Sequence, residues 1–189
     1  MAAGKSDNRE VEIKLPLQNT SAGRRRLRGA GFRVSKRRIF EANVLVDSAD
    51  GRLRNSGCLL RVREAGKQGV LTFKGPAVPG KHKDREELEV RVTDPAMLAH
   101  ILERLGFQEG FRYEKYRTEY KKGGDSGVAT LDETPIGTYL ELEGAPAWID
   151  RMARRMGFRE SDYITASYYA LYVDYCRRHN QEPANLTFK

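Results

Sequence analysis

Glu10-Val11-Glu12-Ile13-Lys14-Leu15, near the start of the chain, alternates charged residues with apolar ones. Successive side chains of a β-strand point to opposite faces, so this segment predicts a strand with one ionic face and one apolar face. The same alternation recurs in six further segments: Leu60-Arg61-Val62-Arg63, Leu71-Thr72-Phe73-Lys74, Glu87-Leu88-Glu89-Val90-Arg91-Val92, Lys115-Tyr116-Arg117-Thr118-Glu119-Tyr120, Thr130-Leu131-Asp132 and Tyr139-Leu140-Glu141-Leu142-Glu143. Seven predicted strands therefore share one two-faced pattern.

Helices are predicted between some of these strands, where apolar residues recur at helical spacing and the stretch ends in Gly-Phe. The three endings fall at residues 27–32, 102–107 and 152–158. Asp94 and Pro95 are typical of the N-cap and the first position of the second of these helices. A last helix is predicted at about residues 162–178, followed by a loose tail.

The ionic faces of the predicted strands carry both signs in equal number. The acidic positions are Glu10, Glu12, Glu87, Glu89, Asp132, Glu141 and Glu143, and the basic positions are Lys14, Arg61, Arg63, Lys74, Arg91, Lys115 and Arg117. A single strand would normally turn such a face to water. Seven balanced faces favour a closed antiparallel barrel whose lumen holds the charges, which neutralise one another. The intervening aliphatic residues, such as Val62, Leu88 and Val90, would then pack against helices outside the barrel.

Length and composition set limits on the class of protein. The 189 residues suit a single domain over 1–189, with tunnel strands at about 9–143 and C-terminal helices at about 147–178. The net charge of +8 predicts attraction to polyanions. With only two cysteines and no Cys-x-x-Cys spacing, we expect neither a disulfide framework nor a thiolate zinc site. With neither a signal peptide nor an apolar stretch of about 20 residues, we expect a cytoplasmic protein without a membrane partner.

The Glu-x-Glu pairs are candidate ligands of a divalent metal ion. Two such residues lie about 7 Å apart at their Cα atoms on one strand face, so their carboxylates can converge on one hard cation. Glu10 and Glu12 with Glu141 and Glu143 offer oxygen-only ligation, which suits Mg²⁺ or Mn²⁺ and argues against zinc. The alternative is that some of these glutamates are ion-pair partners of arginines in the lumen.

The lysines and arginines of the same faces suit a triphosphate, because arginine grips phosphate oxygens with two hydrogen bonds and lysine acts as a point charge. Hydrolysis or cyclisation of a triphosphate needs charge neutralisation and in-line positioning more than a covalent nucleophile. The chain has no glycine-rich phosphate loop, and its three histidines are scattered without a matching nucleophile. We therefore expect the charged lumen itself to carry the chemistry.

In their order and intervals these motifs resemble the CYTH superfamily of triphosphate tunnel metalloenzymes, which includes class IV adenylyl cyclases, thiamine triphosphatases and inorganic tripolyphosphatases. The resemblance rests on these segments: Glu10-x-Glu12-x-Lys14, Arg61-x-Arg63, Leu71-Thr72-Phe73-Lys74-Gly75-Pro76, Glu87/Glu89, Lys115-x-Arg117, Asp132 and Glu141-Leu142-Glu143. It implies an α+β fold, in which helices pack outside a closed eight-stranded antiparallel barrel with a charged lumen.

The resemblance also implies roles for individual residues. The triphosphate would be held by Lys14, Arg61, Arg63, Lys74, Lys115 and Arg117. Among these, Lys14, Lys74 and Arg117 would act in catalysis. Metal would be held by Glu10, Glu12, Glu141, Glu143 and Asp132, whereas the resemblance assigns Glu87 and Glu89 less clearly. One departure is Leu45-Val46-Asp47, where many members carry a Tyr-Tyr-Asp or Tyr-Phe-Asp run, so a mechanism that uses a tyrosine there does not transfer.

Several alternatives stay open at this stage. Hydrolysis of an organic or inorganic triphosphate stands ahead of cyclisation of ATP to cyclic AMP and pyrophosphate. The basic stretch at residues 24–38 also allows a nucleic-acid binder, although its aromatic residues are not interleaved as stacking platforms would need. A non-catalytic phosphate-binding module is a third alternative. The loop at residues 75–84 is either a basic lid or a solvated loop, and a homodimer is left open.

The sequence also predicts the behaviour of two variants. Glu12→Ala and Glu141→Ala are expected to abolish metal-dependent turnover. They are also expected to leave the fold intact or more stable, because each removes a like charge from a crowded acidic wall.

Overall fold

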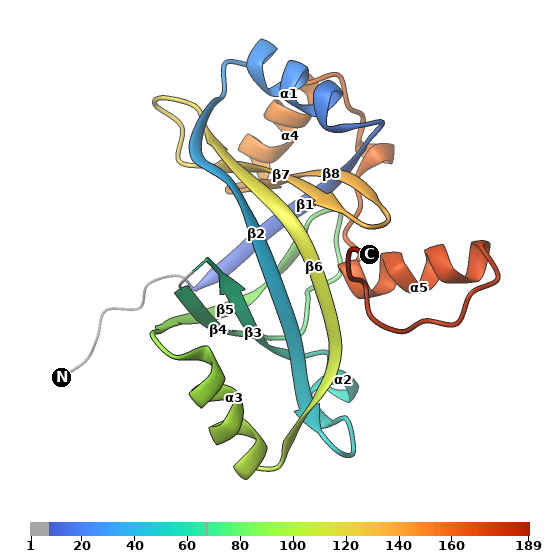
Figure 1. Cartoon of the computed structure of the whole chain (residues 1–189). Coiled ribbons are helices and arrows are strands. Elements are labelled where there is room, and N and C mark those ends of the chain that lie inside the picture. Colours follow the sequence, from blue (N-terminus) through green and yellow to red (C-terminus); the bar gives the residue numbers. More distant parts are fainter. Residues whose placement is uncertain (1–7, 67) are drawn as a thin grey trace.

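In the computed structural model, which describes residues 8–66 and 68–189, eight antiparallel strands close into a barrel (Figure 1). Their order around the barrel is β1-β5-β4-β3-β2-β6-β7-β8. The strands are β1 (Arg9–Leu17), β2 (Arg33–Ser48), β3 (Leu59–Ala65), β4 (Gln68–Lys74), β5 (Lys83–Val92), β6 (Phe107–Lys121), β7 (Val128–Thr134) and β8 (Gly137–Glu143). This confirms the predicted α+β fold with a closed eight-stranded barrel and helices outside.

The eighth strand, β2, is the one that the alternation of charges did not predict. It is 16 residues long and pairs with β3 on one side and with β6, which is 15 residues long, on the other. Its pairing with β6 shifts register in three places, and its first half is exposed. Irregular pairing of this kind interrupts a strict period of two, which is why the sequence pattern is weak there.

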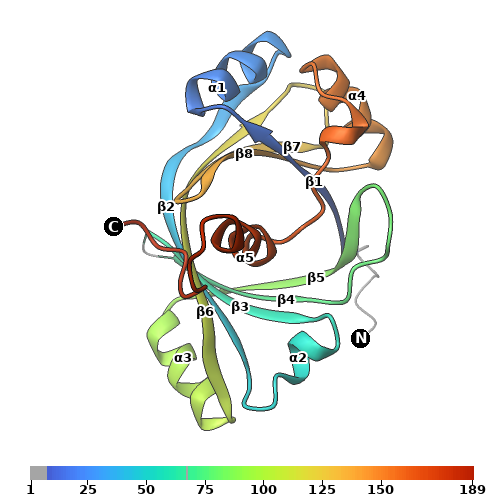
Figure 2. The same cartoon turned by 90° about the vertical axis from the view of Figure 1, so that its right-hand side faces the viewer.

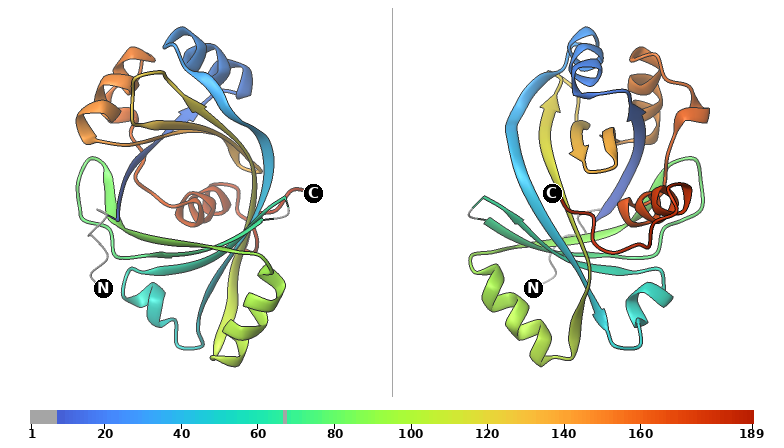
Figure 3. Two further views of the ribbon diagram at one scale, coloured as in Figure 1. Left: turned by 90° about the vertical axis from the view of Figure 1, so that its left-hand side faces the viewer. Right: turned by 45° about the vertical axis from the view of Figure 1, so that its right-hand side comes forward.

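Helices α1 (Thr20–Gly29) and α4 (Pro146–Arg155) cover one side of the barrel and form the main hydrophobic core with the outer faces of the strands (Figures 1 and 3). Ile13, Leu131 and Leu140 are fully buried beneath them. Gly23 of α1 allows close packing, since a Cβ there would come within 2.7 Å of the side chains of Leu17 and Leu131. The prediction of a barrel with apolar residues on its outer face and charged residues in its lumen is therefore confirmed on this side.

The three predicted Gly-Phe helix endings are confirmed. Helices α1, α3 (Pro95–Arg104) and α4 are followed by Gly31, Gly106 and Gly157, whose φ angles of 90°, 88° and 81° lie in the left-handed region. Glycine adopts this conformation without steric cost, so it ends each helix and turns the chain into the next segment.

Coverage of the opposite side is incomplete. Helix α3 packs on β3, β4 and β6 and buries Val62 and Leu102. Leu88 and Val90 of β5, which we expected beneath a helix, are 42% and 56% exposed. The prediction was wrong for these two residues because α3 does not reach over the outer face of β5.

The C-terminal segment differs from the prediction in two respects. The last helix, α5 (Tyr168–Arg178), begins at Tyr168 rather than near residue 162, because residues 160–162 form a short 3₁₀ turn and Ile164 bridges to Lys14 of β1. The tail is not loose. Leu186 is 2% exposed, and both its backbone N–H and its backbone carbonyl form hydrogen bonds with the backbone of β6. As a result, α5 lies across one opening of the barrel (Figures 2 and 3).

No helix among the described residues has the length and apolar character needed to cross a lipid bilayer.

Candidate functional site

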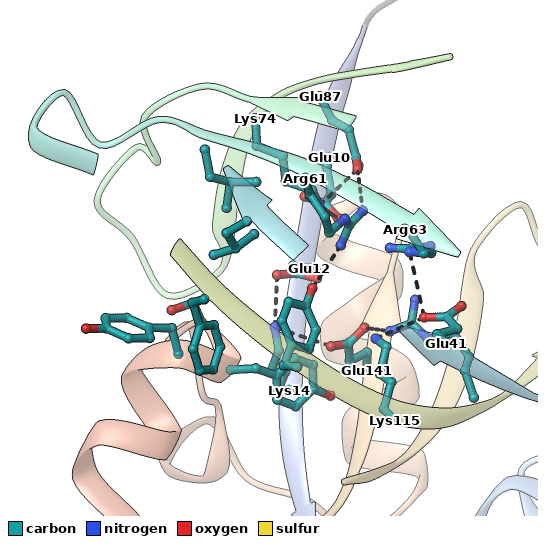
Figure 4. A pocket seen from close by; sticks show the side chains of 18 of the residues that line it. Glu10, Glu12, Lys14, Glu41, Arg61, Arg63, Lys74, Glu87, Lys115 and Glu141 are labelled. Carbon is teal, nitrogen blue, oxygen red and sulfur yellow. Dashed lines mark hydrogen bonds and ion pairs between the residues drawn. The ribbon is translucent and has the colours of Figure 1, made fainter. Parts of the chain in front are cut away.

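A cavity of about 920 Å³ occupies the lumen of the barrel, and charged side chains from several strands point into it (Figure 4). All six predicted triphosphate-binding residues line it: Lys14, Arg61, Arg63, Lys74, Lys115 and Arg117. Four of the five predicted metal ligands line it as well: Glu10, Glu12, Glu141 and Glu143. The structure thus brings together in one space residues that are up to 133 positions apart in the sequence, from Glu10 to Glu143.

The acidic wall consists of carboxylates from β1, β5 and β8. Glu12 of β1 stands directly opposite Glu143 of β8 in the strand register, and Glu87 of β5 lines the same cavity. Partial burial, together with the negative charges of Glu10, Glu87 and Glu12, raises the pKa of Glu143 to about 7. Crowding of like charges therefore leaves Glu143 only partly ionised at neutral pH.

Lysine side chains lie between the other carboxylates of this wall. Lys74 Nζ is 2.6 Å from Glu10 Oε1 and 2.9 Å from Glu87 Oε1. Lys14 Nζ is 3.0 Å from Glu12 Oε1 and 3.4 Å from Glu141 Oε1. Burial opposes ionisation of Glu12, but the ammonium groups of Lys14, Lys83 and Lys74 together outweigh it and hold the pKa of Glu12 well below its usual range. These carboxylates are therefore paired with ammonium groups.

The basic wall is built from β3 and β6. Arg61 donates to Tyr113 Oη at 3.3 Å and to Thr72 Oγ1 at 3.1 Å, and Arg63 donates to Asn43 Oδ1 at 3.2 Å. These neutral partners orient the guanidinium groups, and carboxylates stand farther away, with Glu89 3.4 Å from Arg61 and Glu41 3.7 Å from Arg63. Both arginines remain able to attract an anion in the cavity.

Asp132 lies behind this wall and is not among the residues that line the cavity. It is fully buried, and its carboxylate accepts hydrogen bonds from Lys115 Nζ at 2.7 Å, from Arg117 Nε at 2.7 Å and from Tyr168 Oη at 2.8 Å. A second bond from Arg117 reaches its other oxygen at 2.6 Å. Its oxygens are thus occupied by cations and a hydroxyl, which does not suit the predicted role as a metal ligand.

Two residues of the predicted ionic faces lie at the margin of the site. Arg91 continues the inward-facing row of β5 but is exposed and does not line the cavity, so its assignment to the lumen was wrong. Glu89 does line the cavity and is 3.4 Å from Arg61. Both residues lie beyond Glu86, where the pairing of β5 with β1 ends, and Arg91 is the farther of the two.

Among the charged cavity residues that the sequence analysis missed, three are buried: Glu41, Lys83 and Arg85. Glu41 of β2 is 5% exposed and lies 3.7 Å from both Lys115 and Arg63. Lys83 was expected in the loop at residues 75–84, with Arg85 directly after it, yet both lie at the start of β5 and face Glu12 and Glu10 at 3.4 and 3.3 Å. Alternation over Glu41-Ala42-Asn43-Val44 was a signal that could have revealed Glu41, whereas Lys83-Asp84-Arg85 is charged throughout and has no alternation.

The loop at residues 75–84 rests against the C-terminal half of the chain. His82 Nε2 is 2.8 Å from Asp150 Oδ1 of α4, and Lys81 Nζ is 2.9 Å from Asp150 Oδ2. Burial and the neighbouring Lys14 lower the pKa of Lys83, the next residue, to about 8. The loop thus leads a cationic side chain into the cavity, while its role as a lid stays a prediction.

The residues present suit a hard divalent cation in their chemistry. They offer only carboxylate oxygens, and the raised pKa of Glu143 reflects an excess of negative charge beside Glu10 and Glu12. Among residues 8–66 and 68–189, however, no group of three or more potential ligands is arranged around one point. The lysine ammonium groups stand between the carboxylates, so a cation would have to displace them or bind at Glu143.

Comparisons with known proteins agree with this architecture. The model of the CYTH domain matches residues 8–155. A protein of Methanocaldococcus jannaschii, provisionally named an adenylate cyclase, is 32% identical over 135 residues, which are 71% of this chain and 75% of that protein.

Two solved structures are similar in fold. One, from Vibrio parahaemolyticus and also provisionally named an adenylate cyclase, has a TM-score of 0.74 and 20% identity, covering 86% of this chain and 96% of that one. The other is HpAC1 from Hippeastrum, a provisional adenylyl cyclase described as having a dominant triphosphatase activity. It has a TM-score of 0.64 and 20% identity, covering 92% of this chain and 97% of that one.

Proposed function

Because this chain belongs to the CYTH domain family, we propose that it is a divalent-metal-dependent enzyme that hydrolyses a triphosphate inside the barrel. The observation that carries the proposal is the shared cavity, in which six cationic side chains from four strands face a wall of glutamates. Such a cavity matches a ligand of about four negative charges together with a cation. The HpAC1 structure, with its triphosphatase activity, lends support to hydrolysis.

The residues would divide the work as follows. Arg61 and Arg63 hold the terminal phosphates, since hydrogen bonds to the side chains of Tyr113 and Asn43 orient their guanidinium groups. Lys14 and Lys74 exchange their carboxylate partners for phosphate oxygens when substrate enters, and Arg117 balances the charge that develops in the transition state. Glu10, Glu12, Glu141 and Glu143 would hold Mg²⁺ or Mn²⁺, which when bound neutralises phosphate oxygens. We assign Asp132 to the support of Lys115 and Arg117 instead of to the metal.

The test is a substrate screen with the purified protein. ATP, thiamine triphosphate and tripolyphosphate are each incubated with Mg²⁺ or Mn²⁺, and phosphate, pyrophosphate and cyclic AMP are quantified. Hydrolysis predicts metal-dependent release of phosphate without cyclic AMP. No turnover of any triphosphate with either metal would overturn the proposal.

A matched pair of variants tests whether turnover occurs in the cavity. Arg61 lies in the lumen, whereas Arg91 is exposed outside it. Arg61→Ala is expected to lower kcat/KM by about 100-fold, because a charge-assisted contact to phosphate is worth about 1.5–3 kcal/mol. Arg91→Ala is expected to keep the activity within about twofold of wild type. Equal losses in both variants would contradict catalysis in the lumen.

Adenylate cyclase activity is a second candidate, favoured by the name of the relative from Methanocaldococcus jannaschii. Cyclisation would release pyrophosphate and cyclic AMP from ATP and would leave tripolyphosphate untouched. The product analysis of the same screen separates the two reactions.

A further inference from the structure

Tyr168 reaches the cationic wall of the cavity from outside the segment that matches the family. It is the first residue of α5, whose N-cap Ser167 accepts a hydrogen bond from the backbone of Ala170. Its side chain is 7% exposed and lines the cavity. Most of the barrel residues that face the lumen are charged, so a buried tyrosine at this point calls for an explanation.

Two lysines of the cavity lie over the ring of Tyr168. The Nζ atoms of Lys14 and Lys115 are 5.3 Å and 5.0 Å from the ring centroid. At this distance the electron-rich face of an aromatic ring attracts an ammonium group. The ring therefore restricts two long, flexible side chains that come from different strands, β1 and β6.

The hydroxyl group of Tyr168 acts on the same wall through Asp132. It donates to Asp132 Oδ2 at 2.8 Å, and that carboxylate also holds Lys115 and Arg117. The ring is in turn held by aromatic neighbours, with its centroid 6.1 Å from that of Tyr113 and 5.7 Å from that of Tyr139. Tyr168 is thus in contact, directly or through one carboxylate, with three cations of the site.

Backbone bonds fix the segment that delivers Tyr168. Lys14 N donates to Ile164 O at 2.8 Å, and Ile164 N donates to Lys14 O at 2.9 Å. Beyond α5, Leu186 makes equivalent bonds with Arg112 and Glu114 of β6. The strands that carry Lys14 and Lys115 are therefore the same strands to which the C-terminal segment is attached.

From this arrangement we propose that Tyr168 is a positioning residue, which orders Lys14, Lys115 and Arg117 for binding of a triphosphate. The inference rests on the proposed function. It makes the segment after residue 155 part of the binding site.

The experiment compares Tyr168→Phe, Tyr168→Leu and the control Tyr175→Phe. Tyr175 lies on the same helix and stacks on His179, outside the cavity. Binding of tripolyphosphate is measured by calorimetry without divalent metal, so that this readout is independent of turnover. Thermal unfolding is measured in parallel.

Tyr168→Phe keeps the ring and loses only the hydroxyl bond, so we expect the Kd for tripolyphosphate to rise about fivefold. Tyr168→Leu also loses the attraction to both ammonium groups, and we expect a rise of about 50-fold. Tyr175→Phe should bind as the wild type does. In turnover assays with Mg²⁺, Tyr168→Phe should raise KM about fivefold with kcat within about twofold of wild type.

A merely structural role would give a different pattern. Both variants would then lower the unfolding temperature and the apparent kcat, while KM and Kd stayed unchanged. That pattern, or wild-type Kd values in both variants, would overturn the inference about Tyr168 and leave the proposed function untouched. If Tyr168→Leu does not fold, Tyr168→Phe decides, because it preserves the packing of the ring. Failure of the wild type to bind or hydrolyse any triphosphate would overturn the proposed function and the inference with it.

Discussion

Glu12 and Glu143 face each other across the β1–β8 pair, yet they are in opposite electrostatic situations. Glu12 lies beside the ammonium groups of Lys14 and Lys83, whereas no ion pair of Glu143 is found within the part of the chain that the structure describes. The pKa of Glu12 is lowered by its cationic neighbours, and that of Glu143 is raised to about 7 by burial and by other carboxylates. Removing their charges should therefore have opposite effects on stability.

Glu143→Gln is expected to stabilise the metal-free protein at pH 8. The pKa of Glu143 is higher in the folded state than in the unfolded state. The free energy of unfolding therefore decreases as the pH rises from about 4.5 through about 7. Because solvent reaches Glu143 and screens its repulsion, we expect a gain of only about 1–2 kcal/mol in the free energy of unfolding at pH 8. Urea unfolding at pH 8 and pH 4 measures it, and the gain should vanish at pH 4.

Glu12→Gln is expected to destabilise the protein at neutral pH. Because the pKa of Glu12 is lowered in the folded state, its ionised carboxylate stabilises the fold above about pH 4.5. This contribution to the free energy of unfolding is lost as the pH falls further. Leaving Lys14 buried with fewer partners should cost about 2–4 kcal/mol in the free energy of unfolding at pH 7. The same urea titrations should show this cost shrinking toward pH 3. An equal stability of Glu12→Gln and wild type at pH 7 would contradict the pairing.

These ion pairs revise the expectation drawn from sequence. The acidic wall suggested that Glu12→Ala and Glu141→Ala would leave the fold intact or more stable. Lys14 lies between both carboxylates, so that argument applies to Glu143 instead. Sequence patterns identify which residues share a face, but the partner of each charge depends on side-chain conformation, which the pattern does not contain.

At the scale of the elements, α1 illustrates how a helix is fitted to the barrel. Gly23→Ala should lower the free energy of unfolding by about 1–3 kcal/mol, because the added Cβ would overlap the side chains of Leu17 and Leu131. Gly29→Ala is the control on the same helix, since a Cβ there has no atom within 4 Å. We expect it to be neutral or to stabilise by about 0.5–1 kcal/mol. Equal destabilisation by both changes would contradict close packing at Gly23.

The elements that could be predicted from sequence are those with strict local patterns. Alternation identified seven strands, and the glycines after α1, α3 and α4 marked the helix ends. Strand β2 was missed because its bulges leave only a short stretch of alternation at residues 41–44, and Glu41 was missed with it. The position of α5 and the pinned tail depend on contacts with β1 and β6 that are distant in sequence, so no local pattern could reveal them.

At the scale of the whole molecule, the surplus of positive charge is concentrated in one region of the chain. Residues 20–38 contain eight lysines and arginines and no acidic residue. Arg24, Arg25 and Arg28 of α1 are exposed, and Lys36 and Arg37 of β2 line the cavity. This distribution favours a field that draws anions toward the lumen.

A triple variant of α1, Arg24→Gln, Arg25→Gln and Arg28→Gln, tests that field. We expect kcat/KM for tripolyphosphate to fall about threefold to tenfold at low ionic strength and to match the wild type above about 0.3 M salt, where charges are screened. Stopped-flow binding over a salt series measures the effect. A loss of RNA binding without any change in the salt series would instead favour the nucleic-acid alternative.

Strand β1 is hydrogen-bonded on one side to β5 and on the other to β8, which follows it by more than a hundred residues. The barrel can therefore become a ring only when distant parts of the polypeptide meet, an arrangement that tends to make folding slow. The strand that completes the ring is the one that carries Glu10, Glu12 and Lys14. Refolding and the recovery of ligand affinity should consequently share one rate, with no folded but inactive species accumulating between them.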